Sequence, residues 1–195
     1  MPKTNPEARE RLVATAADML RRRCLNATSI RELAKAAKAP LGSTYHYFPD
    51  GKKQVVTEAI QYAGAKVSRM LEQYLQKGPL DGIKGLLAYW REVLIETEYQ
   101  AGCPVIAAAM EDPAVEEVAL AQVEANIILN RWCALIAGAL KQKGVSKKKA
   151  ENLALAVLAS AEGAIAITRI QKSIAAYDAV CALTLSQIKD ALAES

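Results

Sequence analysis

Histidine and aromatic side chains are scarce in this chain of 195 residues, which has one histidine, four cysteines and 5% aromatics. A single histidine cannot supply the clustered ligands of most zinc enzymes, and HExxH, GxSxG and Gly-rich phosphate-loop motifs are missing as well. We therefore expect no metal, no cofactor and no enzymatic activity. A small all-α enzyme that uses carboxylates or a cysteine stays open as an alternative.

Paired cysteines, a signal peptide and long apolar runs are also missing. Isolated thiols are typical of reduced core residues in a cytosolic protein, and the N-terminal residues, MPKTNPEARERLV, contain no apolar stretch of the kind that signal peptides need. Arg131, Glu162 and Arg169 interrupt the apolar runs before they reach the ~18 residues that cross a bilayer. We expect a cytoplasmic protein that makes no membrane contact. The isolated cysteines are Cys24, Cys103, Cys133 and Cys181.

Acidic residues are under-represented in the first third of the chain. Residues 1–66 carry 12 Lys and Arg against 6 Asp and Glu, whereas residues 67–195 carry 13 against 15. A basic segment indicates an anionic partner, such as nucleic acid or a membrane surface. A solvated surface bias explains the same distribution, so the charge pattern does not choose between the two interpretations.

The β-type alternation of polar and apolar residues is absent, and almost the whole chain has helical period. Leu12, Ala16 and Leu20 share one helical face, and Ser29 followed by Glu32 fits a capping box that starts a second helix. We therefore expect an all-α fold of nine helices, with three short ones in front. Their approximate ranges are 6–23, 29–37, 41–47, 51–76, 80–99, 105–112, 113–143, 146–173 and 175–193.

The segment KGPLDG, residues 77–82, combines Gly and Pro and is a candidate domain junction. We predict an N-terminal domain over residues 6–66 and a C-terminal domain over residues 79–195. The basic charge excess lies in the first of these domains.

Two short helices joined by a tight turn, with a third helix ahead of them, describe a helix-turn-helix module, in which the second helix of the pair enters the DNA major groove. Here that helix is LGSTYHY, residues 41–47, where most of the local aromatics gather. Thr44 and Phe48 are four residues apart and can pack inward onto Leu33 and Leu12. Three consecutive aromatic side chains cannot all point inward from one helix. The outward residues are Ser43, Tyr45, His46 and Tyr47.

Three other residues, one within this helix and two after it, are suited to contact the phosphate backbone of DNA. Gly42 has no side chain, so its backbone can approach a phosphate closely. Lys52 and Lys53 occupy the first turn of the next helix, where cations oppose the helix dipole. A bound phosphate removes that conflict, because it attracts both the lysines and the free N–H groups of the helix start. The arrangement therefore favours DNA as the anionic partner.

Residues 26–60, NATSIRELAKAAKAPLGSTYHYFPDGKKQVVTEAI, resemble the TetR family of bacterial transcription regulators. The resemblance is strong over the first ~60 residues and looser beyond them, and FPDGKKQ with AGCPVIAAAMED is most similar to the branch that contains the LmrA and YxaF regulators. It implies a nine-helix homodimer that binds a near-palindromic operator, usually represses, and is released by a small molecule in its C-terminal domain. The matching residues are Thr28, Leu33, Ala34, Gly42, Tyr45, Tyr47, Phe48 and Lys52.

The resemblance also implies which residues contact DNA. Lys38 and Leu41 depart from the pattern of the family, because Gly is usual in the turn and a polar residue is usual at the start of the recognition helix. Lys38 is therefore expected either to adopt a positive φ or to change the turn, and Leu41 either contacts a thymine methyl group or belongs to the core. The predicted contact residues are Thr28, Ser29, Lys38, Leu41, Gly42, Ser43, Thr44, Tyr45, His46, Tyr47, Lys52 and Lys53.

The C-terminal domain is expected to bind a small, largely apolar effector, for which aromatic and thioether side chains are suitable. Glu162 lies among small apolar residues, where it can bind a cationic ligand, pair with Arg131 or Arg169, or lie at a solvent edge. Core packing accounts for each of the remaining candidates equally well. The candidate ligand-binding residues are Tyr89, Trp90, Cys103, Met110, Trp132 and Glu162.

The last two helices are rich in small residues and are the predicted homodimer interface, since two half-sites require two copies of the chain. Burial within one protomer explains the same small residues. The helix over residues 51–76 connects the two predicted domains, and we expect it to change the spacing of the recognition helices when effector binds. A helical adaptor whose basic front binds an acidic protein is the remaining alternative.

Overall fold

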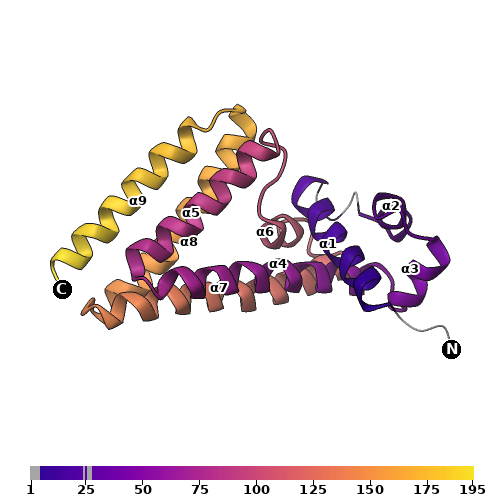
Figure 1. Cartoon of the computed structure of the whole chain (residues 1–195), viewed down its shortest axis with the longest axis horizontal. Coiled ribbons are helices and arrows are strands. Elements are labelled where there is room, and N and C mark those ends of the chain that lie inside the picture. The colour runs from indigo at the N-terminus through magenta and orange to yellow at the C-terminus, as the bar shows by residue number, and fades with distance from the viewer. Residues whose placement is uncertain (1–4, 24, 26–27) are drawn as a thin grey trace. The chain divides into compact units, whose positions relative to one another are not determined.

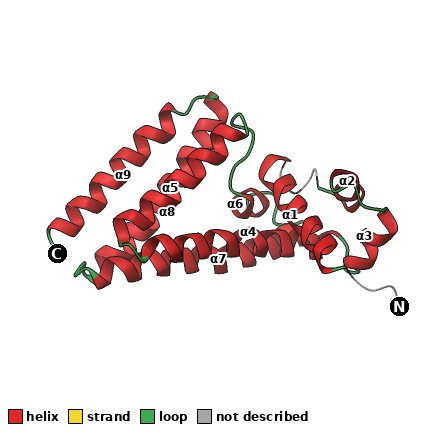
Figure 2. Cartoon of the chain, viewed as in Figure 1, coloured by secondary structure: helices red, strands yellow, loops and turns green. Residues whose placement is uncertain are grey.

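The computed structural model describes residues 5–23, 25 and 28–195, and this part of the chain forms nine α-helices and no strand (Figures 1 and 2). The expected all-α class and helix number are thereby confirmed. The helices are α1 (Pro6–Arg23), α2 (Ile30–Ala36), α3 (Leu41–Tyr47), α4 (Lys52–Leu75), α5 (Pro79–Glu96), α6 (Pro104–Ala109), α7 (Glu116–Gln142), α8 (Lys147–Gln171) and α9 (Ala175–Ala193).

Most helix boundaries lie within a few residues of the expected ones, and two of the larger differences have local causes. Helix α7 begins at Glu116 rather than at Pro113, because Asp112 folds the chain into a turn. Its carboxylate accepts the N–H of Ala114 (2.9 Å), and its carbonyl oxygen accepts the N–H of Val115 (3.1 Å). An Asp side chain that bonds the backbone two residues later competes with helix formation at that point.

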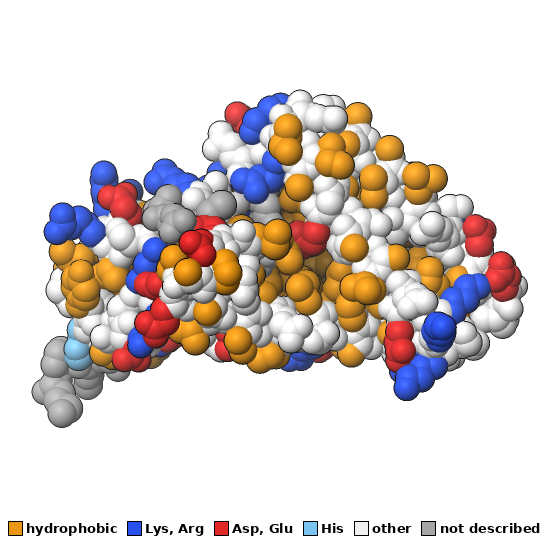
Figure 3. Space-filling view, turned by 180° about the vertical axis from the view of Figure 1, so that it is seen from behind, with side chains coloured by type: hydrophobic (Ala, Val, Ile, Leu, Met, Phe, Trp, Pro, Cys, Tyr) orange, Lys and Arg blue, Asp and Glu red, His pale blue; other side chains and the backbone are white. Residues whose placement is uncertain are grey.

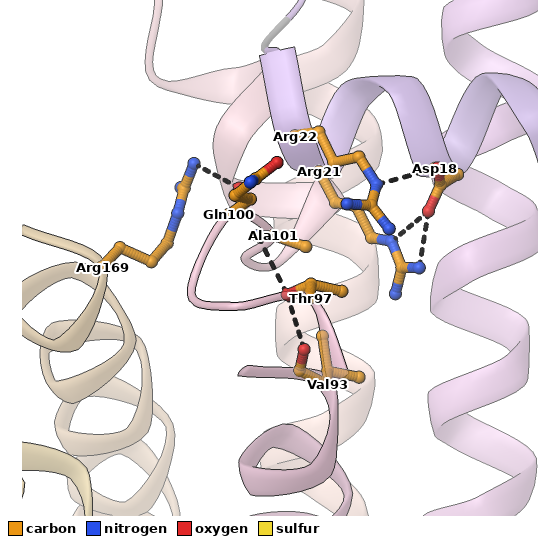
Figure 4. A network of polar contacts seen from close by, with 8 residues as sticks. All are labelled: Asp18, Arg21, Arg22, Val93, Thr97, Gln100, Ala101 and Arg169. Carbon is orange, nitrogen blue, oxygen red and sulfur yellow. Dashed lines mark hydrogen bonds and ion pairs between the residues drawn. The ribbon is translucent and has the colours of Figure 1, made fainter. Parts of the chain in front are cut away.

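Helix α5 ends at Glu96 because Glu98 and Tyr99 adopt left-handed backbone conformations, with φ of +50° and +61°. Thr97 closes this end, since its hydroxyl donates to the carbonyl oxygen of Val93 (2.6 Å) and accepts the N–H of Ala101 (3.2 Å). Figure 4 shows these bonds together with the guanidinium of Arg169, which donates to the carbonyl oxygen of Gln100 (3.1 Å). The loop after α5 is thus held by side-chain bonds where regular helical bonding stops.

The chain folds into two compact units that do not coincide with the domain boundary expected from sequence. The first unit comprises residues 1–65 and 103–128, and the second comprises residues 66–102 and 129–195. Residues 103–128 belong to the first unit because α6 packs on α1 and the carboxylate of Glu111 accepts the N–H of Leu25. The functional division into residues 6–66 and 79–195 stays a prediction.

The core of the first unit comes from α1, α2, the residue after α3, the first half of α4, α6 and the first half of α7. Each of these segments places its apolar stripe inward, and burial of such side chains contributes roughly 1.5–3 kcal/mol apiece. Phe48 is fully buried, as expected for the residue that anchors α3. The fully or almost fully buried side chains include Leu12, Ala16, Leu20, Leu33, Phe48, Val56 and Ile60.

In the second unit, α8 and α9 pack against each other and both pack against α5. Two large aromatic side chains of this unit, Trp132 and Tyr177, are fully buried with their polar atoms paired, which avoids the cost of an unsatisfied group. The indole N–H of Trp132 donates to the hydroxyl of Ser68 (3.1 Å), and the Tyr177 hydroxyl donates to the carbonyl oxygen of Leu87 (2.9 Å). Burial also raises the pKa of the Tyr177 phenol. Both side chains therefore contribute to the core of this unit.

Helices α7 and α8 are long and apolar enough to cross a membrane when length and composition are considered by themselves. In each, 39% of the most apolar 18-residue window is buried within the fold. Core helices of water-soluble proteins pass the same test, so composition does not assign either helix to a membrane. The expectation that the protein makes no membrane contact stays a prediction.

Candidate nucleic-acid interface

The start of α2 is fixed by the predicted cap. Ser29 is the N-cap residue, and its hydroxyl accepts the N–H of Glu32 (3.1 Å). This bond satisfies one of the free N–H groups of the first turn. Ser29 itself is exposed, whereas the neighbouring Thr28 is buried. Of these two predicted contact residues, only Ser29 presents its side chain to solvent.

The turn between α2 and α3 contains Lys38, for which the sequence left open a positive φ or a different turn. Lys38 has a φ of +51°, its N–H donates to the carbonyl oxygen of Lys35 (3.2 Å), and the N–H of Ala39 donates to that of Ala34 (2.9 Å). This pair of bonds is the Schellman motif, in which Gly normally occupies the left-handed position. The turn therefore has the geometry in which Gly is usual, and Lys38 adopts a conformation that lysine disfavours. Its side chain is exposed.

Helix α3 is held down by Thr44 and Phe48, and both side chains are fully buried. The Thr44 hydroxyl donates to the carbonyl oxygen of Pro40 (3.1 Å), which also accepts the N–H of Thr44 (3.1 Å). Thr44 was included among the predicted contact residues, but its side chain lies inside and supports the helix instead. The inward pair at positions four apart fixes which face of α3 points outward.

The outward face of α3 carries the remaining predicted residues. Tyr45 is 54% exposed, Leu41 is 38% exposed, and Ser43 and His46 are exposed as well. Leu41 is thus a surface residue and not part of the core. A side chain at Gly42 would meet no atom within 4 Å, so the space in front of its backbone is open. Figure 3 shows Lys and Arg side chains and the single histidine on the surface of this unit.

Tyr47 lies at the edge of this face. It is half-buried, and its phenol oxygen accepts the N–H of Asn5 (3.2 Å) at the start of α1. Its ring is tilted by 54° to that of His46, with 6.1 Å between the ring centroids. The phenol can still interact with a further partner, because a hydroxyl is both donor and acceptor.

The turn that follows α3 leads directly into α4. Gly51 has a φ of +69°, and its N–H donates to the carbonyl oxygen of Phe48 (3.0 Å). Lys52 is half-buried in the first turn of α4, and Lys53 is exposed and forms an ion pair with Glu116 (3.4 Å). An exposed pair of this kind contributes little to stability, so Lys53 can exchange the carboxylate for a phosphate at small cost.

A polar network behind α3 was not anticipated from sequence. The Glu58 carboxylate accepts hydrogen bonds from Arg9 (2.6 Å) and Gln54 (2.9 Å), and Gln54 accepts the N–H of Asp50 (3.2 Å). The i, i+4 spacing of Gln54 and Glu58 on α4 is a signal that sequence reasoning could have used. Arg9 is 49 positions away from Glu58, and only the tertiary fold brings it there.

The basic residues at the end of α1 are partly neutralised by their own helix. Arg21 and Arg22 both pair with the carboxylate of Asp18, at 2.5 and 3.0 Å (Figure 4). Spacings of three and four residues place them on one side of the helix. Among the described residues, no group of three His, Cys, Asp or Glu side chains is placed to hold a metal ion.

The six predicted ligand-binding residues are divided between the two units. Cys103 is buried and Met110 is 77% exposed in the first unit. In the second, Trp90 and Trp132 are buried, Glu162 is half-buried, and Tyr89 lies edge-on to Trp90 with ring centroids 5.1 Å apart. A surface depression of about 690 Å³ between α8 and α9 is lined by other residues, including Lys148 and Asp190. The effector site stays a prediction.

Comparison with known families and relatives agrees with this geometry. A family model described as "Bacterial regulatory proteins, tetR family" matches residues 12–59. A second model, described as "Transcriptional regulator LmrA/YxaF-like, C-terminal domain", matches residues 79–182. An uncharacterized HTH-type transcriptional regulator of Mycobacterium tuberculosis is 34% identical over 175 residues, which are 88% of this chain and 89% of that relative.

The HTH-type transcriptional regulator LmrA of Bacillus subtilis is 27% identical over 174 residues, which are 86% of this chain and 89% of LmrA. The crystal structure of regulatory protein TetR from Rhodobacter sphaeroides superposes with a TM-score of 0.82 over 92% of this chain and 98% of that one. Its sequence identity is 20%, so this likeness concerns the fold.

Proposed function

The chain belongs to the TetR family of bacterial transcriptional regulators, and we propose that within it this DNA-binding regulator is a repressor that a small-molecule ligand releases from its operator. Family membership makes it a regulator and not an enzyme. The proposal adds the direction of regulation, the near-palindromic operator, the effector and the dimer surface.

The observation that carries the proposal is that α3 has one buried face and one exposed polar face. Thr44 and Phe48 are fully buried, while Ser43, Tyr45 and His46 point outward beside an open space at Gly42. A helix with buried anchors on one side and hydrogen-bonding groups on the other suits base edges and phosphates in a major groove. These groups, with Lys52 and Lys53 after the turn, are the DNA contacts of the proposed complex.

A homodimer through α8 and α9 supplies the second recognition helix that a palindromic operator needs. Exposed apolar side chains lie on both helices, with Leu155 62%, Ile170 82% and Leu183 68% exposed in the protomer. A side chain added at Gly163 would meet no atom within 4 Å, so another helix can approach α8 closely there. Large apolar residues beside small ones suit a self-complementary helix pair.

The effector would act in the C-terminal part and report through α4. This helix has its first residues in the first unit and its last residues in the second. A ligand that binds two conformations with different affinity shifts the equilibrium between them, and α4 is the continuous element that spans that change. The candidate ligand residues remain Tyr89, Trp90, Cys103, Met110, Trp132 and Glu162. The proposed location is the cytoplasm, and the proposal includes no cofactor and no membrane.

Selection of bound sequences from random duplex DNA tests this proposal directly. A palindromic consensus whose affinity falls steeply with salt supports an operator-binding dimer. Retention on heparin without any sequence preference would instead support a helical adaptor that binds an acidic partner. Once the consensus is known, ligand-saturated protein that binds it as tightly as ligand-free protein would refute release by that ligand.

A further inference from the structure

We propose that Glu58 and Gln54 on α4 and Arg9 on α1 form a positioning relay that sets the orientation of α3 for sequence discrimination. None of these three residues belongs to the outward face of α3. The inference rests on the proposed operator binding, because it concerns how accurately that face is presented to DNA. We call the three residues the Glu58 relay.

The centre of the relay is a single carboxylate oxygen. Glu58 Oε1 accepts Arg9 Nη2 at 2.6 Å and Gln54 Nε2 at 2.9 Å, so one atom joins two helices. The Glu58 side chain is 21% exposed, so solvent and salt screen these bonds less than they would screen bonds of a fully exposed carboxylate. Bonds that involve a charged group are the stronger ones, and two of them at one oxygen fix its position.

Each partner of Glu58 continues to the C-terminal end of α3. Gln54 Oε1 accepts the backbone N–H of Asp50 at 3.2 Å, which holds the turn that follows the helix. The guanidinium carbon of Arg9 lies 5.4 Å from the centroid of the Phe48 ring, within the range of a cation–π contact. The relay therefore holds both the buried anchor of α3 and the backbone immediately after it.

The segment that the relay holds contains the fully buried Phe48 and a left-handed glycine turn. The N–H of Phe48 donates to the carbonyl oxygen of Thr44 (3.1 Å), and Gly51 reverses the chain direction with a φ of +69°. Glycine in a left-handed turn allows many backbone conformations, so external bonds must select one. Asp50 and Gln54 supply such a bond across this turn, and Glu58 fixes the Gln54 amide that makes it.

Because Glu58 is negatively charged, its two possible roles change DNA affinity in opposite directions. A carboxylate in a unit that binds a polyanion opposes DNA binding at every sequence, so its removal by itself strengthens all DNA binding. A positioning residue has the opposite effect on the operator, because a displaced α3 loses base contacts that only the correct sequence offers. Discrimination between two DNA sequences therefore separates positioning from charge.

The main test uses Gln54→Met, which removes both relay bonds of the amide without changing net charge or side-chain length. Gln61→Met, at an exposed position of α4, is the matched control. Dissociation constants are measured by fluorescence anisotropy on the selected palindromic duplex and on a scrambled duplex of equal length and composition. Gln54→Met is expected to lower the ratio of the two affinities about tenfold, while affinity for the scrambled duplex is unchanged.

Glu58→Gln is the second variant. It is expected to bind the scrambled duplex more tightly than wild type, since a negative charge is gone, and yet to discriminate less well between the two duplexes. Melting curves accompany both variants, but the ratio of affinities is independent of the folded fraction, because only folded protein binds either duplex. A merely structural role lowers the melting temperature and leaves this ratio unchanged.

Equal discrimination by wild type, Gln54→Met and Gln61→Met would overturn the relay while leaving operator binding intact. Tighter binding of Glu58→Gln to both duplexes by the same factor would do so too, since charge would then account for the whole effect. A wild-type protein that does not distinguish the two duplexes would instead refute the proposed function, and the relay with it.

Discussion

The backbone N–H of Asn5 donates to the phenol oxygen of Tyr47 at 3.2 Å, which ties the start of α1 to the last residue of α3. The ring of Tyr47 is half-buried, so this residue has a structural contact and a surface that faces outward. Stability and DNA affinity therefore respond differently to substitutions at this one position.

Tyr47→Ala is expected to weaken binding to the selected operator about tenfold, the effect of losing a stacking or phosphate contact. Its melting temperature should change by only a few degrees, because the ring is not fully buried. Tyr47→Phe keeps the ring and loses the bond to Asn5, and it separates the two contributions. A fall of many degrees in Tyr47→Ala would show that Tyr47 is a core residue and not a DNA contact.

Lys38→Gly should stabilise the protein by about 1 kcal/mol, since lysine at a φ of +51° is disfavoured and glycine is not. For a chain of this size the melting temperature should rise by about 2–4 °C in calorimetry. Ala36→Gly is the control, because Ala36 is the last residue of α2, where glycine costs helix propensity and should lower stability. A lower melting temperature for Lys38→Gly would contradict the left-handed strain.

Lys52→Ala should weaken binding to every duplex by a similar factor, because a phosphate contact carries no sequence information. The slope of log affinity against log salt should become shallower by about one unit. Lys141→Ala, at the exposed end of α7, is the control of equal charge and should leave the slope unchanged. A sequence-dependent loss would mean that Lys52 reads bases.

Leu183→Arg should dissociate the proposed dimer, because it puts a charge on an apolar side chain of α9 that is 68% exposed in the protomer. Sedimentation velocity at micromolar concentration would then detect protomers, and palindromic DNA would bind more weakly. Val123→Arg introduces the same charge on α7, at a residue 59% exposed, and should leave the dimer intact. Dissociation by Val123→Arg and not by Leu183→Arg would move the interface to α7.

The ion pair between Arg91 and Asp178 should give a pH-dependent contribution to stability. The hydrogen bond from Arg91 (2.8 Å) lowers the pKa of the Asp178 carboxyl below its ordinary value. The contribution is therefore complete above a pH of about 4 and is lost as pH falls through the lowered pKa. Asp178→Asn should melt slightly below wild type at neutral pH, and the difference should disappear in acid.

Glu92→Gln, at an exposed position one residue away from Arg91, is the control for that experiment. It should melt like wild type at both pH values. High salt should reduce the Asp178→Asn difference as well, because the pair is exposed and salt screens it. A difference that grows in acid would mean that another group is responsible.

The helices, the cap at Ser29 and the inward anchors of α3 all followed from local patterns in the sequence. The sequence left the turn at Lys38 open between a positive φ and a different turn, and the structure has the positive φ. Period, capping and turn preferences act between residues a few positions apart, so a single sequence contains them. The family resemblance of residues 26–60 depends on the same local residues, and comparison with known proteins confirmed it.

Only the tertiary structure decided which distant segments share a core. It placed residues 103–128 in the unit of the recognition helix, and it brought Arg9 to the carboxylate of Glu58, 49 positions away. Such pairings depend on how helices pack as whole bodies, and periodicity within one helix contains no information about its partner.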